Sequence, residues 1–307
     1  MKKVLFATTA LVATAGVAAA DVEWSGSAGA GIFYDADNTG DTDTDYDGTG
    51  VGMYNFVNLQ ATLSGETENG LTFGGSVGVD VGRDFDTGDF EFDGDEDGTA
   101  GFDSLFISGA FGTITFDHNG VDNLYDDDFD AHDIMYAYDV SGFSVALTYD
   151  VQADSGAGEL WSMMLGYDMD GISASLAIDD SDDVNVELAY DVTSEVTVGL
   201  GYDTGAGEAH SGNDYSTDLS VDYDDGTFAV GAMVDSDENY EVSFGYSMDG
   251  LDLGVAVFND ESANETDYTL TGSYDLGGGL SVIGGYDNDE SAHTNGSVWY
   301  LGAAMSF

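Results

Sequence analysis

Apolar and polar residues alternate along almost the whole chain, and this alternation restricts the possible folds more than any other feature. In the stretch VTVGLGYD (196–203), the Val, Leu and Tyr side chains share one face, and Thr, Gly and Asp share the other. A period of two residues is typical of β-strands with one apolar and one polar face. The same pattern recurs at 143–150, 184–191, 240–247 and 266–275. No segment has a convincing helical stripe, so we predict an all-β fold.

Two kinds of connection alternate between the expected strands. One kind is short and rich in Gly, Asp and Asn, as tight hairpin turns are; the other is longer, acidic and variable. The short turns lie at 68–70, 111–113, 141–142, 169–171, 193–195, 224–226, 248–250 and 277–279. These turns and two free ends predict about eighteen strands in up-and-down order.

Several features favour a membrane barrel over a soluble sandwich, in which strands also alternate. The expected strands are about ten residues long, enough to cross a bilayer when tilted. The polar face carries Ser, Thr, Gly, Asp and Glu, which need contact with water. A closed barrel supplies a water-filled lumen for this face and leaves no strand edge exposed to lipid. Tyr-Asp pairs at strand ends would form an interfacial aromatic girdle. Their rings are Tyr149, Tyr167, Tyr190, Tyr202, Tyr223, Tyr274 and Tyr286.

The N-terminus and the charge indicate an exported protein with cationic partners. Residues 1–20 contain Lys2 and Lys3, an apolar run and a small-residue site, as a cleaved signal peptide does, so residues 21–307 are expected to form one barrel. Cleavage leaves Arg83 as the only Lys or Arg against 61 acidic residues. Such a charge excludes nucleic acid as a partner and favours cations. No cysteine is present, which excludes disulfides and thiolate sites.

Many acids have the polar parity and are predicted to line the pore. Wall charges of one sign would attract cations and repel anions. Arg83 has the parity of Val79 and Val81 and is expected at the rim outside the lumen. The predicted lining residues are Asp150, Glu187, Asp191, Asp203, Asp218, Asp222, Glu241, Asp252, Asp267 and Asp275.

The acidic stretch DADNTGDTDTDYDGTG (35–50) contains the first half of a calcium loop of EF-hand type. The position of the closing glutamate falls on Tyr54, so an EF-hand is not expected. A looser, weak calcium site and a plain solvated loop both remain open. DGDEDG repeats the spacing in the expected second external loop. The candidate ligands are Asp43, Asp45, Asp47, Asp93, Asp95 and Asp97.

The histidines give little support for a metal centre or an enzyme. His118 and His132 are fourteen residues apart and lack a third spaced ligand. His210 and His293 lie near acids, but acids surround every histidine in this composition. No nucleophile-elbow serine motif is present, so we predict that the protein is not an enzyme and needs no cofactor, calcium aside.

The C-terminal stretch WYLGAAMSF (299–307) puts apolar residues on one face and ends on Phe307. It resembles the last strand of bacterial outer-membrane proteins, in which the final Phe is the signal for the assembly machinery. The resemblance implies an outer-membrane location, with lipid around the barrel.

More narrowly, the chain resembles the general porins of alphaproteobacteria, the Rhodobacter type. The resemblance rests on VEWSGSAGAGIFYD (22–35), SLFISGAFGTITFD (104–117) and YDLGGGLSVIGGYDND (274–289). It implies a homotrimeric barrel of about sixteen strands for passive diffusion of small hydrophilic solutes and ions. With the turn count, the prediction is a transmembrane up-and-down antiparallel β-barrel of about 16 to 18 strands, with no helices in the mature chain beyond short loop turns.

The family's third external loop folds inward and narrows the pore, a role that would fall here to residues 117–133. Tyr125 and Phe129 are expected to anchor it to the wall. The loop is short for this role, and the family's basic wall residues are missing. The predicted constriction residues are Asp122, Asp126, Asp127, Asp128, Asp130 and Asp133.

The function predicted is therefore a cation-selective outer-membrane porin. The alternative is a barrel that acts as a structural anchor or adhesin through its acidic loops.

Overall fold

A computed structural model describes residues 21–35, 50–88, 90–125, 131–151, 160–204, 215–261, 265–288 and 297–307, with only the backbone for 91–99. The expected signal peptide at 1–20 lies outside these ranges. The described residues form strands and connections. They contain no helix, and therefore no helix that could cross a membrane.

Eighteen strands follow one another along the chain. They are β1 (Asp21–Asp35), β2 (Val51–Glu66), β3 (Thr72–Asp86), β4 (Glu91–Gly109), β5 (Gly112–Val121), β6 (His132–Val140), β7 (Phe143–Tyr149), β8 (Trp161–Met169), β9 (Ile172–Asp179), β10 (Val184–Asp191), β11 (Val196–Asp203), β12 (Ser216–Asp224), β13 (Phe228–Asp235), β14 (Tyr240–Met248), β15 (Leu251–Asp260), β16 (Glu265–Gly277), β17 (Leu280–Asn288) and β18 (Val298–Ser306).

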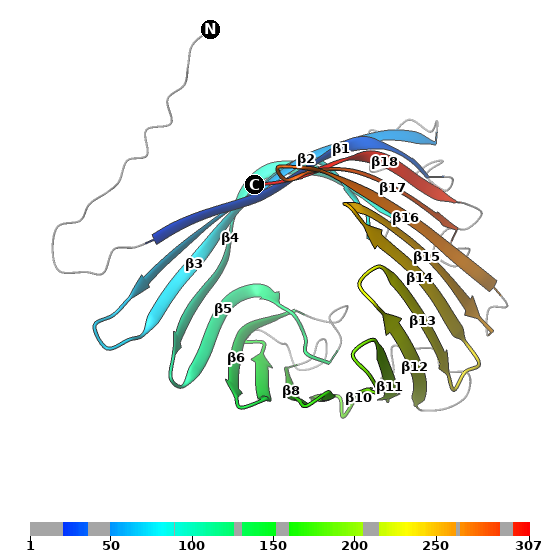
Figure 1. Cartoon of the computed structure of the whole chain (residues 1–307). Helices are drawn as coiled ribbons and strands as arrows, with labels where there is room; N and C mark the ends of the chain where they lie inside the picture. The colour runs from blue at the N-terminus through cyan, green and yellow to red at the C-terminus, as the bar shows by residue number, and fades with distance from the viewer. Residues whose placement is uncertain are drawn as a thin grey trace, which may run out of the picture.

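Each strand pairs antiparallel with its neighbours in sequence, and β1 also pairs with β18 (Figure 1). The sheet is therefore a closed up-and-down barrel, as the sequence predicted, at the upper end of the expected strand range. Backbone bonds from Gly26 N to the Phe307 oxygen (2.9 Å) and from Phe307 N to the Gly26 oxygen (3.1 Å) continue the seam to the last residue. Closure pairs every strand edge, which a barrel in lipid requires.

Tight turns join the strands at one end of the barrel, as predicted. Ser141 and Gly142 both have positive φ (51° and 82°), and Asp170 with Gly171 repeats the pattern (57° and 75°). Two positive φ angles define the type I′ turn, whose twist matches that of the flanking strands. At the other end, four connections of four residues, at 87–90, 180–183, 236–239 and 261–264, are shorter than the sequence pattern suggested.

The apolar face of the sheet is widely exposed, as a lipid-facing surface is. Leu200 pairs with Leu219, and Val242 pairs with Val257, so apolar side chains stand next to one another across strands. Aromatic pairs such as Phe143 with Tyr167, with ring centroids 4.9 Å apart, lie close to the tight turns. The outer face thus has the expected apolar surface with aromatic rings toward its edge.

The third connection differs from the expected loop of 117–133. β5 continues to Val121, and β6 begins at His132, so the connection covers 122–131. The register shifts between Phe116 and Val121, which lets the strand run on past an irregularity. We call 122–131 the third loop below.

The second external loop was predicted wrongly. DGDEDG (93–98) lies within β4, where Asp95 pairs in register with Arg83 and Asp97 with Val81. Asp93, Asp95 and Asp97 are therefore strand residues, because pairing with β3 overrides the loop composition of the sequence.

The β3–β4 hairpin bends away from the wall at Gly82. The β1–β2 pair continues up to Tyr34 and Val51, but the β2–β3 pair ends at Asn55 and Arg83. Gly82 has φ 115° and lies so close to Asn55 that an added Cβ would clash with the Asn55 carbonyl oxygen. Only glycine has both the conformational freedom and the size for this bend.

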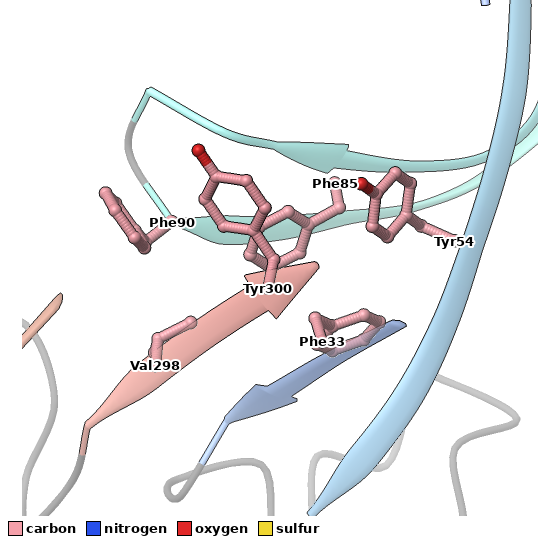
Figure 2. Packing of buried hydrophobic residues seen from close by; sticks show 6 residues of the cluster. All are labelled: Phe33, Tyr54, Phe85, Phe90, Val298 and Tyr300. Atoms are coloured by element: carbon pink, nitrogen blue, oxygen red, sulfur yellow. The ribbon is translucent and has the colours of Figure 1, made fainter. Parts of the chain in front are cut away.

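Beyond the bend, the hairpin and the wall together form a buried cluster, which we call the ring cluster. It consists of Phe33, Tyr54, Phe85, Phe90, Val298 and Tyr300 (Figure 2). Phe33, Tyr54 and Tyr300 come from β1, β2 and β18 and have the parity opposite to the exposed apolar face. Phe85 and Phe90 come from the hairpin and cover them. The cluster is the main buried apolar core of the described residues.

We predict that Gly82→Ala lowers the free energy of unfolding by about 1–3 kcal/mol, because it adds backbone strain and a steric clash. Urea unfolding of the protein in lipid vesicles measures the change. Gly101→Ala is the matched control, since an added Cβ there meets no atom within 4 Å. An equal and small effect of the two substitutions would contradict the assigned role of Gly82.

Candidate functional site

Acidic residues form rows across neighbouring strands on the face opposite to the exposed apolar face. Glu187 of β10 pairs with Gly201 of β11, which pairs with Asp218 of β12, and Asp218 pairs with Asp235 of β13. An added Cβ at Gly201 would clash with the Asp218 carboxylate, so the carboxylate extends over the glycine. Three strands thus present carboxylates at one level of the barrel.

A second row lies nearer to the tight turns. Asp191 accepts a hydrogen bond from Thr197 Oγ1 (2.8 Å), and Thr197 pairs with Asp222. On the same face, a cavity of about 590 Å³ is lined by residues that include Asp168, Ser175 and Glu187. The polar face is therefore hollowed and carries negative charge.

The other predicted wall acids have more local surroundings. Glu241 pairs with Met233 and Phe258, and Asp267 is buried opposite Phe258. Asp252 accepts a long hydrogen bond from Ser273 Oγ (3.5 Å), and Asp275 caps a tight turn by accepting from Gly277 N (2.7 Å).

Arg83 is the only Lys or Arg of the chain after residue 20. It lies on β3 and pairs in register with Asn55, directly after the bend at Gly82, so its predicted position outside the lumen stays a prediction. The rows of carboxylates on β10–β13 therefore have no opposing lysine or arginine on their own strands.

The described part of the third loop packs onto the polar face. Leu124 N donates to Ser162 Oγ of β8 (2.8 Å), and the Tyr125 hydroxyl donates to Asp203 Oδ1 of β11 (2.7 Å). Asn123 is buried, and its Oδ1 accepts from Tyr125 N (2.9 Å). The loop thus leaves β5 and reaches β11, so Tyr125 does anchor it to the wall, as predicted.

The two wall residues that receive the loop are themselves fixed. Ser162 forms a short hydrogen bond (2.5 Å) with Thr148 of β7, and both side chains are fully buried. Asp203 Oδ2 accepts from Asn185 Nδ2 (3.0 Å). Sequence analysis did not single out Thr148, Ser162 or Asn185, because nothing distinguishes them from the many polar residues of the same parity.

The environment of Tyr125 raises the pKa of its hydroxyl above the usual value of 10, first through burial and then through the hydrogen bond to Asp203. The hydroxyl therefore stays protonated and able to donate at neutral pH.

Asp133 fixes the base of the third loop. Its Oδ1 accepts from His118 Nδ1 (3.0 Å) and Asn119 N (3.2 Å), and its Oδ2 accepts from Val151 N (2.9 Å). The carboxylate is buried and joins β5 to the connection after β7, where Asp150 lies beside it. This geometry gives Asp133 a structural role beside the predicted one in the constriction.

The remaining predicted site residues lie partly inside and partly outside the described ranges. Asp122 is inside them and is exposed at the start of the third loop. Among the residues that the structure describes, no group of three His, Asp or Glu side chains could hold a metal ion. Outside the described ranges lie Asp43, Asp45 and Asp47 of the first loop and Asp126, Asp127, Asp128, Phe129 and Asp130 of the third.

A family model for Gram-negative porins matches residues 7–294. The chain belongs to the Gram-negative porin family. The porin is therefore placed in the bacterial outer membrane, as a channel of that membrane. Assembly into a homotrimer and recognition of Phe307 by the assembly machinery stay predictions from the resemblance.

Solved structures support the fold of the porin. A triple mutant of the Rhodopseudomonas blastica porin aligns with a TM-score of 0.57 at 16% identity, covering 94% of this chain and 100% of that chain. A porin structure refined at 1.8 Å aligns with a TM-score of 0.53 at 18% identity over the same shares. No curated protein matches the porin in sequence. These likenesses establish the barrel fold.

We predict that Tyr125→Phe lowers the free energy of unfolding by about 1 kcal/mol, because it removes a hydrogen bond to a carboxylate. Tyr190→Phe is the control, since Tyr190 is exposed on the apolar face of neighbouring β10. Urea unfolding at pH 7 measures both variants.

The raised pKa of Tyr125 also gives the difference a pH dependence. The contribution of the hydroxyl is complete below the unfolded pKa of about 10 and is lost as the pH rises above that value. The gap between the wild type and Tyr125→Phe should therefore shrink above pH 10. A gap that is absent at pH 7, or that grows in alkali, would contradict the tether.

Proposed function

We propose that this porin is a cation-selective passive diffusion channel for small hydrophilic solutes and ions. The observation that carries the proposal is the set of carboxylate rows on the polar face of β10–β13, which have no lysine or arginine beside them. A pore lined by one sign of charge in a low-dielectric wall concentrates counter-ions and repels co-ions. The proposed lining residues are the ten wall acids predicted from the sequence.

We also propose that the third loop narrows this channel. The tethers from Leu124 to Ser162 and from Tyr125 to Asp203 support the proposal, because they hold the loop against the polar face. Asp122 and the aspartates after Tyr125 would then contribute charge at the constriction. Asp203 anchors Tyr125 and adds its carboxylate to the same region.

We predict that the reversal potential in a KCl gradient favours potassium over chloride. The double variant Asp218→Asn/Asp222→Asn should weaken this preference, because it removes two carboxylates from β12. Asp170→Asn is the control: it removes one charge at an exposed tight turn, where Asn tolerates the positive φ of 57°. Chloride preference in the wild type, or an equal effect of the control, would reject the proposal.

Weak calcium binding by Asp43, Asp45 and Asp47 stays a proposal from their spacing. Asp93, Asp95 and Asp97 lie on β4 and not in a loop, and their part in such a site stays a proposal as well. Replacing the three first-loop aspartates with Asn should abolish any gain in thermal stability at millimolar calcium. A gain that survives the substitutions would leave this stretch as a solvated loop.

The alternative function, a structural anchor or adhesin, differs from the proposed channel in whether the barrel conducts. A barrel with this function needs no open pathway, whereas the proposed channel must conduct.

A further inference from the structure

The β3–β4 hairpin is a second segment that leaves the wall on the polar side of the sheet, separate from the third loop. Its contacts lie on β1, β2, β17 and β18, whereas the third loop contacts β8 and β11. The two segments therefore lie on different parts of the barrel wall. The hairpin has no role in the function proposed above.

Ring contacts fix the hairpin against the wall. The Phe85 ring centroid lies 4.9 Å from that of Phe33, 5.6 Å from Tyr54 and 5.5 Å from Tyr300, and Phe90 lies 5.3 Å from Tyr300. Phe85 and Phe90 are 2% and 4% exposed, so they are as well buried as the wall residues beneath them. Offset aromatic pairs of this kind stabilise beyond their buried area.

The wall is shaped to receive these rings. Gly285 of β17 lies under Phe90 and Tyr300, and an added Cβ there would lie 2.7 Å from Phe90 Cε1 and 2.5 Å from Tyr300 Cε1. A side chain at this position would push the hairpin away from the wall, toward the interior of the barrel. The glycine therefore permits the close approach of a segment that begins four strands away around the barrel.

The docked hairpin carries charge on its other side. Successive strand residues point in opposite directions, so with Phe85 against the wall, Asp84 and Asp86 are directed away from it. Asp86 is exposed. Because the wall residues beneath Phe85 have the polar, inward parity, the direction away from them is the interior of the barrel.

We propose that the β3–β4 hairpin is a second inward element of the channel and that Asp86 contributes to its cation specificity. This inference rests on the proposed function, because it assigns specificity to the same pathway. The width left open to solutes on this side of the barrel is then set by the hairpin docked on the ring cluster and not by the wall alone.

Cysteine modification in single-channel recordings tests the position of Asp86, because the chain has no other cysteine. D86C is labelled with a cationic and, separately, an anionic methanethiosulfonate reagent. We expect the potassium conductance of the cationic adduct to be about half that of the anionic adduct, since nearby charges act through water with energies near RT. E238C is the matched control: Glu238 is exposed on the β13–β14 connection at the same end of the barrel, and its substitution removes the same charge.

Equal conductance of the two D86C adducts, or failure of D86C to react, would overturn the inference. A wild type that forms no channels or prefers chloride would overturn the proposed function, and the inference with it. Preserved cation selectivity with equal adducts would overturn the inference alone.

A second variant tests the docking itself. F85A removes the ring at the centre of the cluster and should increase both the mean conductance and the open-channel noise, because the hairpin is released. F228A is the control, since Phe228 pairs with Phe244 and Tyr246 on the apolar face. Conductance and noise in F85A that match F228A would contradict docking by the ring cluster.

Discussion

The need to pair every backbone hydrogen-bonding group in a medium without water governs this structure. A sheet can meet that need in lipid only by closing, and here β1 meets β18 along nine residue pairs, from Ser27 with Ser306 to Asp35 with Val298. Closure gives the sheet two faces with opposite requirements. The apolar residues must face lipid, and the same period of two then directs Ser, Thr, Asp and Glu to the interior. The acidic interior is thus a consequence of closure combined with an extreme composition.

The segments that leave the wall depend on the same two faces. The third loop carries polar groups and bonds to Ser162 and Asp203, whereas the β3–β4 hairpin carries rings and packs against Phe33 and Tyr300. Each segment finds a patch of the inner wall with matching chemistry. A barrel of eighteen strands has room for both, while smaller barrels fill their interior with side chains.

Regular elements could be predicted from the sequence, because local pattern determines them. β10 (Val184–Asp191) and β11 (Val196–Asp203) begin and end where the alternation predicted, and the short turn at 141–142 lies where its Ser-Gly sequence predicted one. DGDEDG was mistaken for a loop, because its extension of β4 depends on pairing with β3. The bend at Gly82 was also missed, since one glycine among 44 gives no local signal.

The candidate site was predictable in chemistry and less so in geometry. Parity selected Asp203 as a wall residue, but its bond to Tyr125 links positions 78 residues apart and could not be read from spacing. Asp133 was chosen for its charge, and its burial under three donors depends on how β5 and the connection after β7 flank β6. The same holds for Phe85: it continues the parity of Val81 on the apolar face, but the bend at Gly82 brings its ring against the inner wall.

Single-channel conductance across a range of KCl concentrations tests the central claim, an open pathway lined by carboxylates, most directly. The Debye length grows from about 3 Å at 1 M to about 30 Å at 0.01 M, so wall charges concentrate cations most strongly in dilute salt. The account predicts discrete conductance steps that fall less than proportionally as KCl is lowered. Folded protein that gives no steps, or steps strictly proportional to the salt concentration, would contradict it.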